Sequence, residues 1–152
     1  MACSFLLSAD MSHSVNPNYP GKYEAEHRPE MNKGVVIKVN ANQRYTTNAP
    51  GVVLIQQLAQ RAKTATNPSV ESNRQGIPLQ FFVVRNDTPC GGTIGPMSAA
   101  KLGVRTLDLG NAQLSIHSIR ETGGAYDVEH AINLFDSFYT NFVELNEKIE
   151  VD

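Results

Sequence analysis

The sequence lacks several features that would assign it directly to a functional class. It has two cysteines, Cys3 and Cys90, and their spacing matches no metal or redox motif. The N-terminus has no charged segment followed by a long apolar one, so we expect no secretory signal. We therefore expect free thiols in a reducing compartment and a cytoplasmic location.

Positive charge and long apolar runs are also scarce. The chain has 13 Lys and Arg against 15 Asp and Glu, for a net charge of −2, and no basic cluster. Nucleic-acid binding depends on neutralising phosphates with Lys and Arg, so we expect no nucleic-acid partner. Because no apolar run approaches the roughly 20 residues of a membrane helix, we expect no membrane partner either.

The pattern of apolar residues predicts an α/β fold. A chain of 152 residues with 41% apolar residues fits one domain with a sizeable core. Short apolar segments predict strands at residues 3–9, 34–39, 79–84, 104–109 and 114–119. Apolar residues at spacings of three and four predict helices at residues 51–63, 97–102 and 128–149. Such alternation is typical of a largely buried sheet covered by helices.

Capping residues set the expected ends of these helices. Asn48 fits an N-cap with Pro50 in the first turn, and Gly103 fits the end of the second helix. Asp127 is expected to cap the last helix. The apolar residues expected to face the core from that helix are Val128, Ala131, Ile132, Phe135, Phe138, Tyr139, Phe142, Leu145 and Ile149.

Two segments have no helix or strand pattern. Residues 16–32 are polar and rich in proline, and they predict a long loop of the kind that often carries function. Residues 64–76 have one large apolar residue, Val70, and no periodicity. We interpret this second segment as a surface-loop insertion within the domain.

The change of polarity at residues 8–20, SADMSHSVNPNYP, indicates a candidate site. An apolar strand leads directly to Asp10 and His13, and prolines close the segment. A strand that fixes the backbone, followed by a loop with reactive side chains, is a common arrangement of functional sites. The alternative is a polar turn in which Asp and Asn side chains stabilise the backbone.

Asp10 and His117 are candidate metal ligands. A carboxylate and an imidazole are ligands that zinc and related metals prefer. The alternatives are a carboxylate in an ordinary turn for Asp10 and a hydrogen-bonded histidine within a strand for His117. Their separation in the sequence does not decide between these readings.

Lys38 and the glycine-rich turn at residues 89–96 are candidate anion sites. Adjacent glycines before a helix can present backbone N–H groups to an anion, although this turn matches neither the P-loop nor the dinucleotide fingerprint. Lys38, near a strand end, suits an acidic ligand group. A plain tight turn and a solvated lysine are the alternatives. Ligands in open α/β sheets bind at the carboxyl ends of strands, where these groups and Asp10 are expected.

The sequence resembles the aspartyl aminopeptidases, the M18 family of metallo-aminopeptidases. The resemblance covers nearly the whole chain except residues 64–76. It is carried by five blocks in order: SADMSHSVNPNYP, HRPEMNKGVVIKVNANQRYTTNA, FFVVRNDTPCGGTIGP, KLGVRTLDLG and QLSIHSIRE.

This resemblance implies a three-layer α/β/α zinc-peptidase-like catalytic domain, of which residues 1–152 would be the C-terminal part. It implies a two-zinc enzyme that removes Asp or Glu from peptide N-termini and forms homo-oligomers when full length. It assigns Asp10 to one zinc ion, His117 to the other, His13 to the substrate pocket, Lys38 to the acidic side chain of the substrate, and Gly92, Thr93 and Gly95 to the border of that pocket. Asn16 stands where many members have a histidine.

Other residues that the family uses are missing from this chain. The remaining ligands lie in a His-x-Asp motif, at a bridging Asp and at a Glu beside the general-base Glu. The sequence contains neither a His-x-Asp triplet nor a Glu-Glu pair. A catalytic zinc needs about three protein ligands, so we expect weak zinc binding and negligible activity from this chain by itself. The alternative is a truncated, non-catalytic paralogue that associates with full-length subunits.

Overall fold

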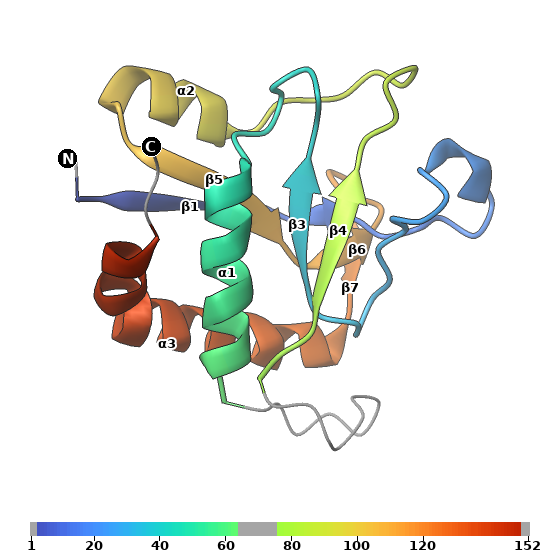
Figure 1. The fold of residues 1–152 in the computed structure, drawn as a ribbon. Coiled ribbons are helices and arrows are strands. Elements are labelled where there is room, and N and C mark those ends of the chain that lie inside the picture. Colours follow the sequence, from blue (N-terminus) through green and yellow to red (C-terminus); the bar gives the residue numbers. More distant parts are fainter. Residues whose placement is uncertain (1–2, 64–75, 150–152) are drawn as a thin grey trace.

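The computed structural model describes residues 3–63 and 76–149 of the chain (Figure 1). The predicted surface insertion at residues 64–76 lies outside this part except for Gly76. The strands form a mixed four-stranded sheet in the order β1 (Phe5–Ala9), β5 (Arg105–Gly110), β3 (Val35–Val39) and β4 (Leu79–Val83). Strand β1 is parallel to β5 and β3 is parallel to β4, whereas β3 and β5 are antiparallel.

A second, smaller sheet contains β2 (Ser12–His13), β6 (Ala112–Leu114) and β7 (Thr122–Gly123). The prediction of a strand at residues 114–119 is wrong, because the strand ends at Leu114. Ser115 and His117 have φ angles of 59° and 68°, and this left-handed backbone cannot continue a strand. His117 therefore lies in the turn between β6 and β7, not in a strand.

Three α-helices and one 3-10 helix accompany the strands: η1 (Pro20–Lys22), α1 (Ala49–Arg61), α2 (Ile94–Leu102) and α3 (Ala125–Lys148). The Asn48 cap is confirmed, since its side-chain oxygen accepts a 2.9 Å hydrogen bond from the Gly51 N–H. Gly103 ends α2 with a left-handed φ of 61°, as expected of a glycine C-cap. The prediction that Asp127 is the N-cap of α3 is wrong, because Gly124 occupies that position.

The hydrophobic core lies between the sheet and helices α1 and α3. It includes Val35, Ile37, Leu54, Ile55, Leu58, Leu107, Leu109, Leu134 and Leu145. Side chains alternate between the two faces of a sheet, so the Asp108 side chain points away from this core. On that other face, Gly95 of α2 lies directly against the Asp108 side chain. Helices therefore lie on both faces of the sheet, and the predicted α/β architecture is confirmed.

The predicted core-facing stripe of α3 is partly wrong. Leu145 is buried as predicted, but Val128, Ile132 and Tyr139 are 58%, 61% and 84% exposed. The buried Leu134 was not in the predicted set. The remaining predicted residues are partly buried against the core: Ala131, Phe135, Phe138, Phe142 and Ile149. The predicted stripe was wider than the face that one helix presents to a core.

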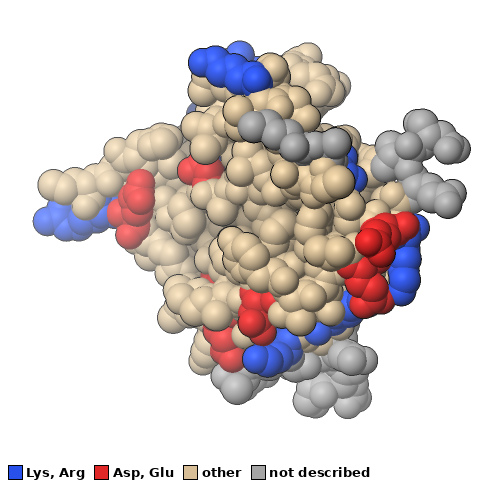
Figure 2. Space-filling view, turned by 90° about the vertical axis from the view of Figure 1, so that its left-hand side faces the viewer, with Lys and Arg blue, Asp and Glu red and all other residues tan. Residues whose placement is uncertain are grey.

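Strand β1 is an edge of the four-stranded sheet, with β5 on one side and no other strand beside it among residues 3–63 and 76–149. Figure 2 shows the side of the molecule that includes the N-terminal end of β1, where the centre of the surface has few charged groups and acidic and basic groups lie toward its margins. In the described ranges, no helix combines the length and apolarity that crossing a membrane requires.

Asp127 connects α3 to the beginning of β3. Its carboxylate is fully buried and accepts hydrogen bonds from the backbone N–H groups of Asn32 and Gly34, at 2.6 and 3.0 Å. Gly34 has a φ of 103°, and an added Cβ would lie 2.1 Å from the carbonyl oxygen of Pro78. The loop before β3 is therefore held by a carboxylate that replaces backbone pairing.

We predict that Asp127→Asn destabilises the fold by about 1.5–3 kcal/mol, because one of the two buried N–H groups loses its charged acceptor. Urea unfolding at neutral pH measures this change. Asp136→Asn is the control, since its side chain is 55% exposed and pairs with Lys63 at the surface. Equal unfolding midpoints for the two variants would contradict the role given to Asp127.

Candidate functional site

The site begins with an ion pair between two strands. Asp10 follows β1 directly, and its Oδ2 lies 3.2 Å from the Nζ of Lys38 on β3. The Lys38 side chain is 3% exposed, whereas the Asp10 side chain is 58% exposed. Burial lowers the pKa of Lys38, and the Asp10 carboxylate acts in the opposite direction. The buried cation therefore depends on an anion that remains accessible to other groups.

Gly110 allows Asp10 to reach this position. A Cβ added at Gly110 would lie 1.6 Å from the carbonyl oxygen of Asp10, so a side chain there is impossible. The Asp10 N–H donates to the Leu109 carbonyl at 2.9 Å, and the Ser12 N–H donates to Asn111 at 2.8 Å. This backbone hydrogen bonding continues from β1 into β2 and holds the two residues between these strands, Asp10 and Met11. The Asp10 backbone is thus set by the sheet rather than by a free loop.

His13 directly follows Ser12 in β2, where it pairs with Gln113, and it lies close to the same charges. Burial lowers the pKa of His13, the positive charges of Lys38 and His117 lower it further, and Asp10 raises it. His13 therefore lies close enough to Asp10, Lys38 and His117 for their charges to change its pKa. The histidine ring also packs near Phe82 of β4, with ring centroids 6.3 Å apart.

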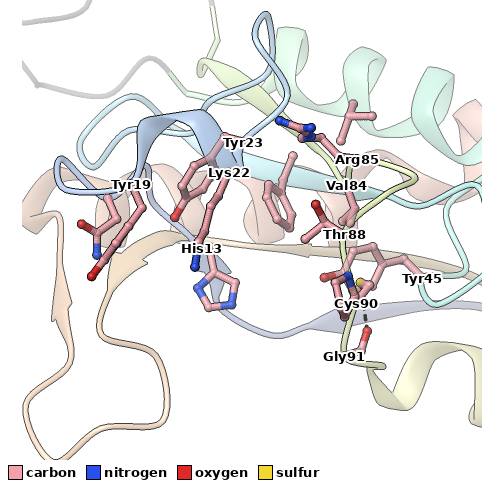
Figure 3. A pocket seen from close by; sticks show the side chains of 14 residues that line it. His13, Tyr19, Lys22, Tyr23, Tyr45, Val84, Arg85, Thr88, Cys90 and Gly91 are labelled. Carbon is pink, nitrogen blue, oxygen red and sulfur yellow. Dashed lines mark hydrogen bonds between the residues drawn. The ribbon is translucent and has the colours of Figure 1, made fainter.

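His13 opens onto a cavity of about 280 Å³ (Figure 3). The cavity lies between residues that follow β2 and residues that follow β4. Its lining residues are His13, Asn16, Tyr19, Lys22, Tyr23, Tyr45, Phe82, Val83, Val84, Arg85, Thr88, Pro89, Cys90 and Gly91. Aromatic side chains and cationic groups on the same walls suit an extended ligand with negative charge.

Tyr45 connects the cavity to the buried Lys38. Tyr45 is 8% exposed, and its ring lines the cavity. The centre of this ring lies 5.5 Å from the Lys38 ammonium. Burial raises the pKa of Tyr45, and a hydrogen bond with the Cys90 thiol acts in the same direction. Tyr45 is therefore a neutral hydroxyl at physiological pH and can donate a hydrogen bond. The next residue, Thr46, donates its backbone N–H to the buried Asp108 carboxylate at 2.7 Å.

His117 occupies an exposed turn with left-handed backbone. The turn is closed by the Ser118 N–H donating to the Ser115 carbonyl at 3.0 Å, and the His117 N–H donates to the Glu121 carboxylate. A non-glycine residue with positive φ needs support from its surroundings, and these contacts provide it. The imidazole is therefore presented to solvent by a defined backbone.

The glycine-rich turn contributes differently from what the sequence suggests. Gly92, Thr93 and Gly95 do not line the described cavity; the lining comes from the preceding residues, Thr88 to Gly91. Gly95 is buried, and an added Cβ would lie 2.3 Å from the Asp108 carboxylate. Lys38 also lies behind the cavity rather than in its lining. The structure thus brings Asp10, His13 and Lys38 together and places Gly95 beside Asp108.

Sequence reasoning missed Tyr45, Phe82, Lys22 and Cys90 as lining residues. Tyr45 lies in a polar turn, and Phe82 lies in a buried strand, so their local patterns predict packing only. Their shared surroundings arise from strand pairing between distant segments. One usable signal was the cluster of Tyr19, Lys22 and Tyr23 in a long polar loop.

Comparison with known proteins identifies the family. The sequence model of a family described as aminopeptidase I zinc metalloprotease (M18) matches residues 1–139. The chain belongs to the M18 family. It is 60% identical over all 152 residues to an aspartyl aminopeptidase of Aspergillus oryzae and 55% identical to aspartyl aminopeptidase 1 of Schizosaccharomyces pombe. In both comparisons this M18 chain is covered completely but spans 29% of the relative's length.

Solved structures agree with this assignment. A chain of the cryo-EM structure of an Ape4 and Nbr1 complex matches with a TM-score of 0.89 and 55% identity, covering 100% of this M18 chain and 26% of its own length. A crystal structure of yeast aminopeptidase 1 matches with a TM-score of 0.78 and 34% identity, covering 97% and 30%. The fold predicted from the resemblance is confirmed, as part of a longer M18 chain.

The metal that the family description implies fits this chain only in part. Asp10 offers an exposed carboxylate and His117 an exposed imidazole, which are donors that zinc accepts. Within residues 3–63 and 76–149, however, no three or more His, Cys, Asp or Glu side chains form a group that could hold a metal. The described residues therefore do not make a complete zinc site by themselves.

We predict that Asp10→Asn lowers the pKa of Lys38 further, since the anion that opposes the effect of burial is removed. NMR titration of carbon-labelled lysine side chains measures this pKa directly. Folding stability of the variant should then rise more steeply as pH increases toward about 10.5, because the unfolded chain keeps the lysine proton longer than the folded chain. Asp87→Asn is the control, and an unchanged Lys38 pKa in Asp10→Asn would refute the coupling.

Proposed function

We propose that this chain is part of a zinc-dependent aminopeptidase that removes Asp or Glu from peptide N-termini. Family membership and the 60% identity to an aspartyl aminopeptidase carry this proposal. The juxtaposition of Asp10, Lys38 and His13 beside an aromatic, cationic cavity supports it. Because the chain spans 29% of that relative, we propose that residues 1–152 form the C-terminal part of a catalytic domain.

In this proposal Asp10 and His117 supply ligands to two different zinc ions, and further ligands come from polypeptide outside this chain. Zinc would polarise the scissile carbonyl and activate water. Lys38 would pair with the carboxylate of the N-terminal residue, and Asp10 would be one of the residues that hold the metal. The observed pairing of a buried Lys38 with an exposed Asp10 supports these two roles.

The other site residues would shape the substrate pocket. His13, kept neutral by burial and by neighbouring positive charge, would accept or donate one hydrogen bond without repelling a free amine. Gly92 and Thr93 in the loop before α2, and Gly95 in its first turn, would border the pocket beyond the residues that line the described cavity. The edge of β1 and the surface beside it, which has few charged groups, are where the remaining domain would pack (Figure 2). The complete enzyme would be a homo-oligomer, like the solved dodecamer of yeast mApe1.

A graft tests this function. We would replace the matched segment of the Aspergillus oryzae aspartyl aminopeptidase with this chain, which aligns over its whole length. We predict zinc-dependent release of Asp from an aspartyl anilide by the graft, and no detectable release by the separate chain. Asp10→Ala in the graft should reduce kcat/KM at least about a hundredfold, since even residues that only support metal ligands cost 10–100-fold.

The controls separate folding from chemistry. Asp136→Ala in the same graft removes an exposed carboxylate of α3 that does not line the cavity, and it should retain activity. A well-folded graft that cleaves neutral N-terminal residues as fast as acidic ones would overturn the proposed specificity. Co-purification of the separate chain with full-length subunits, without catalysis, would favour the non-catalytic paralogue instead.

A further inference from the structure

The cavity has a positively charged lining, and the Lys22 ammonium in it has no ion-pair partner among the described residues. Its charged lining residues are Lys22 and Arg85, and no carboxylate lines it. Arg85 is already neutralised, since its Nε and Nη2 donate to Asp87 at 2.9 and 2.6 Å. Among the residues that the structure describes, no carboxylate forms an ion pair with Lys22, whose Nζ lies 4.9 Å from the ring centroid of Tyr19.

The backbone holds Lys22 at this wall of the cavity. Arg85 Nη1 donates to the Gly21 carbonyl at 2.7 Å, which joins η1 to the segment after β4. The Lys22 N–H donates to the Tyr19 carbonyl at 3.1 Å, and the Tyr23 hydroxyl donates to the Ser14 carbonyl at 2.8 Å. Lys22 is therefore carried by a segment with contacts on both sides. Figure 3 shows Lys22 and Tyr23 on the wall opposite Thr88 and Cys90.

Lys22 and Lys38 are in different positions relative to the cavity. Lys38 is buried, is paired with Asp10 and lies behind the lining. Lys22 lines the cavity and lies beside Tyr19, which is 56% exposed. A peptide whose first carboxylate is directed to Lys38 would leave Lys22 to face the following residue. The aromatic side chains of Tyr19, Tyr23 and Phe82 offer apolar contact for the peptide between these points.

We propose that Lys22 is a specificity-determining residue that pairs with an acidic side chain at the second position of a bound peptide. This inference rests on the proposed function, because it takes a peptide with an acidic N-terminal residue as the ligand. The effect should be modest, since exposed ion pairs contribute about 0.2–1 kcal/mol. Such an energy corresponds to a preference of up to about fivefold for Glu over Gln at that position.

Peptide binding to this chain tests the inference without requiring catalysis. The nitrogen-15 labelled chain would be titrated with the tetrapeptides Asp-Glu-Ala-Ala, Asp-Gln-Ala-Ala and Ala-Gln-Ala-Ala, followed by NMR shifts of the lining residues. We expect Asp-Glu-Ala-Ala to bind about threefold more tightly than Asp-Gln-Ala-Ala. Lys22→Gln should remove this difference, and Lys22→Glu should reverse it. Lys101→Gln, on the exposed end of α2, should leave it unchanged.

Each other result overturns the inference. A Glu preference that persists in Lys22→Gln, or is absent from the natural sequence, excludes Lys22 as its source. If Lys22→Gln instead removes the preference for Asp-Gln-Ala-Ala over Ala-Gln-Ala-Ala, the lysine recognises the first carboxylate and the assignment to the second position is wrong. Failure of the proposed function would be seen separately, as a graft that releases no Asp. The preference at the second position is measured on this chain whatever the graft does.

Discussion

The ion pair between Lys38 and Asp10 is the interaction on which the candidate site depends. It requires β1 and β3 to approach the same part of β5, although one is parallel and the other antiparallel to it. The register pairs Val36 and Ile37 with Gly110 and Leu109, which places the middle of β3 across β5 from the end of β1. Gly110 permits the closest backbone approach at this point. A buried lysine is tolerable there because an anion lies 3.2 Å away.

The proposed metal site is incomplete among the described residues. Asp10 is exposed on the side away from Lys38, and His117 is presented by a strained turn, yet no group of three metal ligands exists among the described residues. Both candidate ligands are exposed. The M18 relatives are more than three times longer, which is consistent with a site completed from outside the matched segment.

Local sequence signals predicted the fold better than the site. The Asn48 cap, the Gly103 end of α2 and the apolar strands all depend on interactions between near neighbours in the chain, and they are confirmed. The prediction of a strand through His117 was wrong because Ser115 and His117 adopt positive φ angles, which the amino-acid composition does not reveal. The cavity was not predictable, since Tyr45, Phe82 and Cys90 meet only after strands from distant segments pair. The sequence pattern made Asp10, His13 and Lys38 candidates and the family resemblance gave each a role, and in the structure Asp10 lies 3.2 Å from Lys38 with His13 close to both charges.

The zinc content of the separate chain tests the central claim most directly, that it carries only part of a two-metal site. The chain would be purified, exposed to excess zinc, dialysed and analysed for metal by mass spectrometry. We predict that less than one zinc ion per chain is retained, because a catalytic zinc requires about three protein ligands. Retention of two zinc ions per folded chain would contradict it, since a complete site would then exist within these 152 residues.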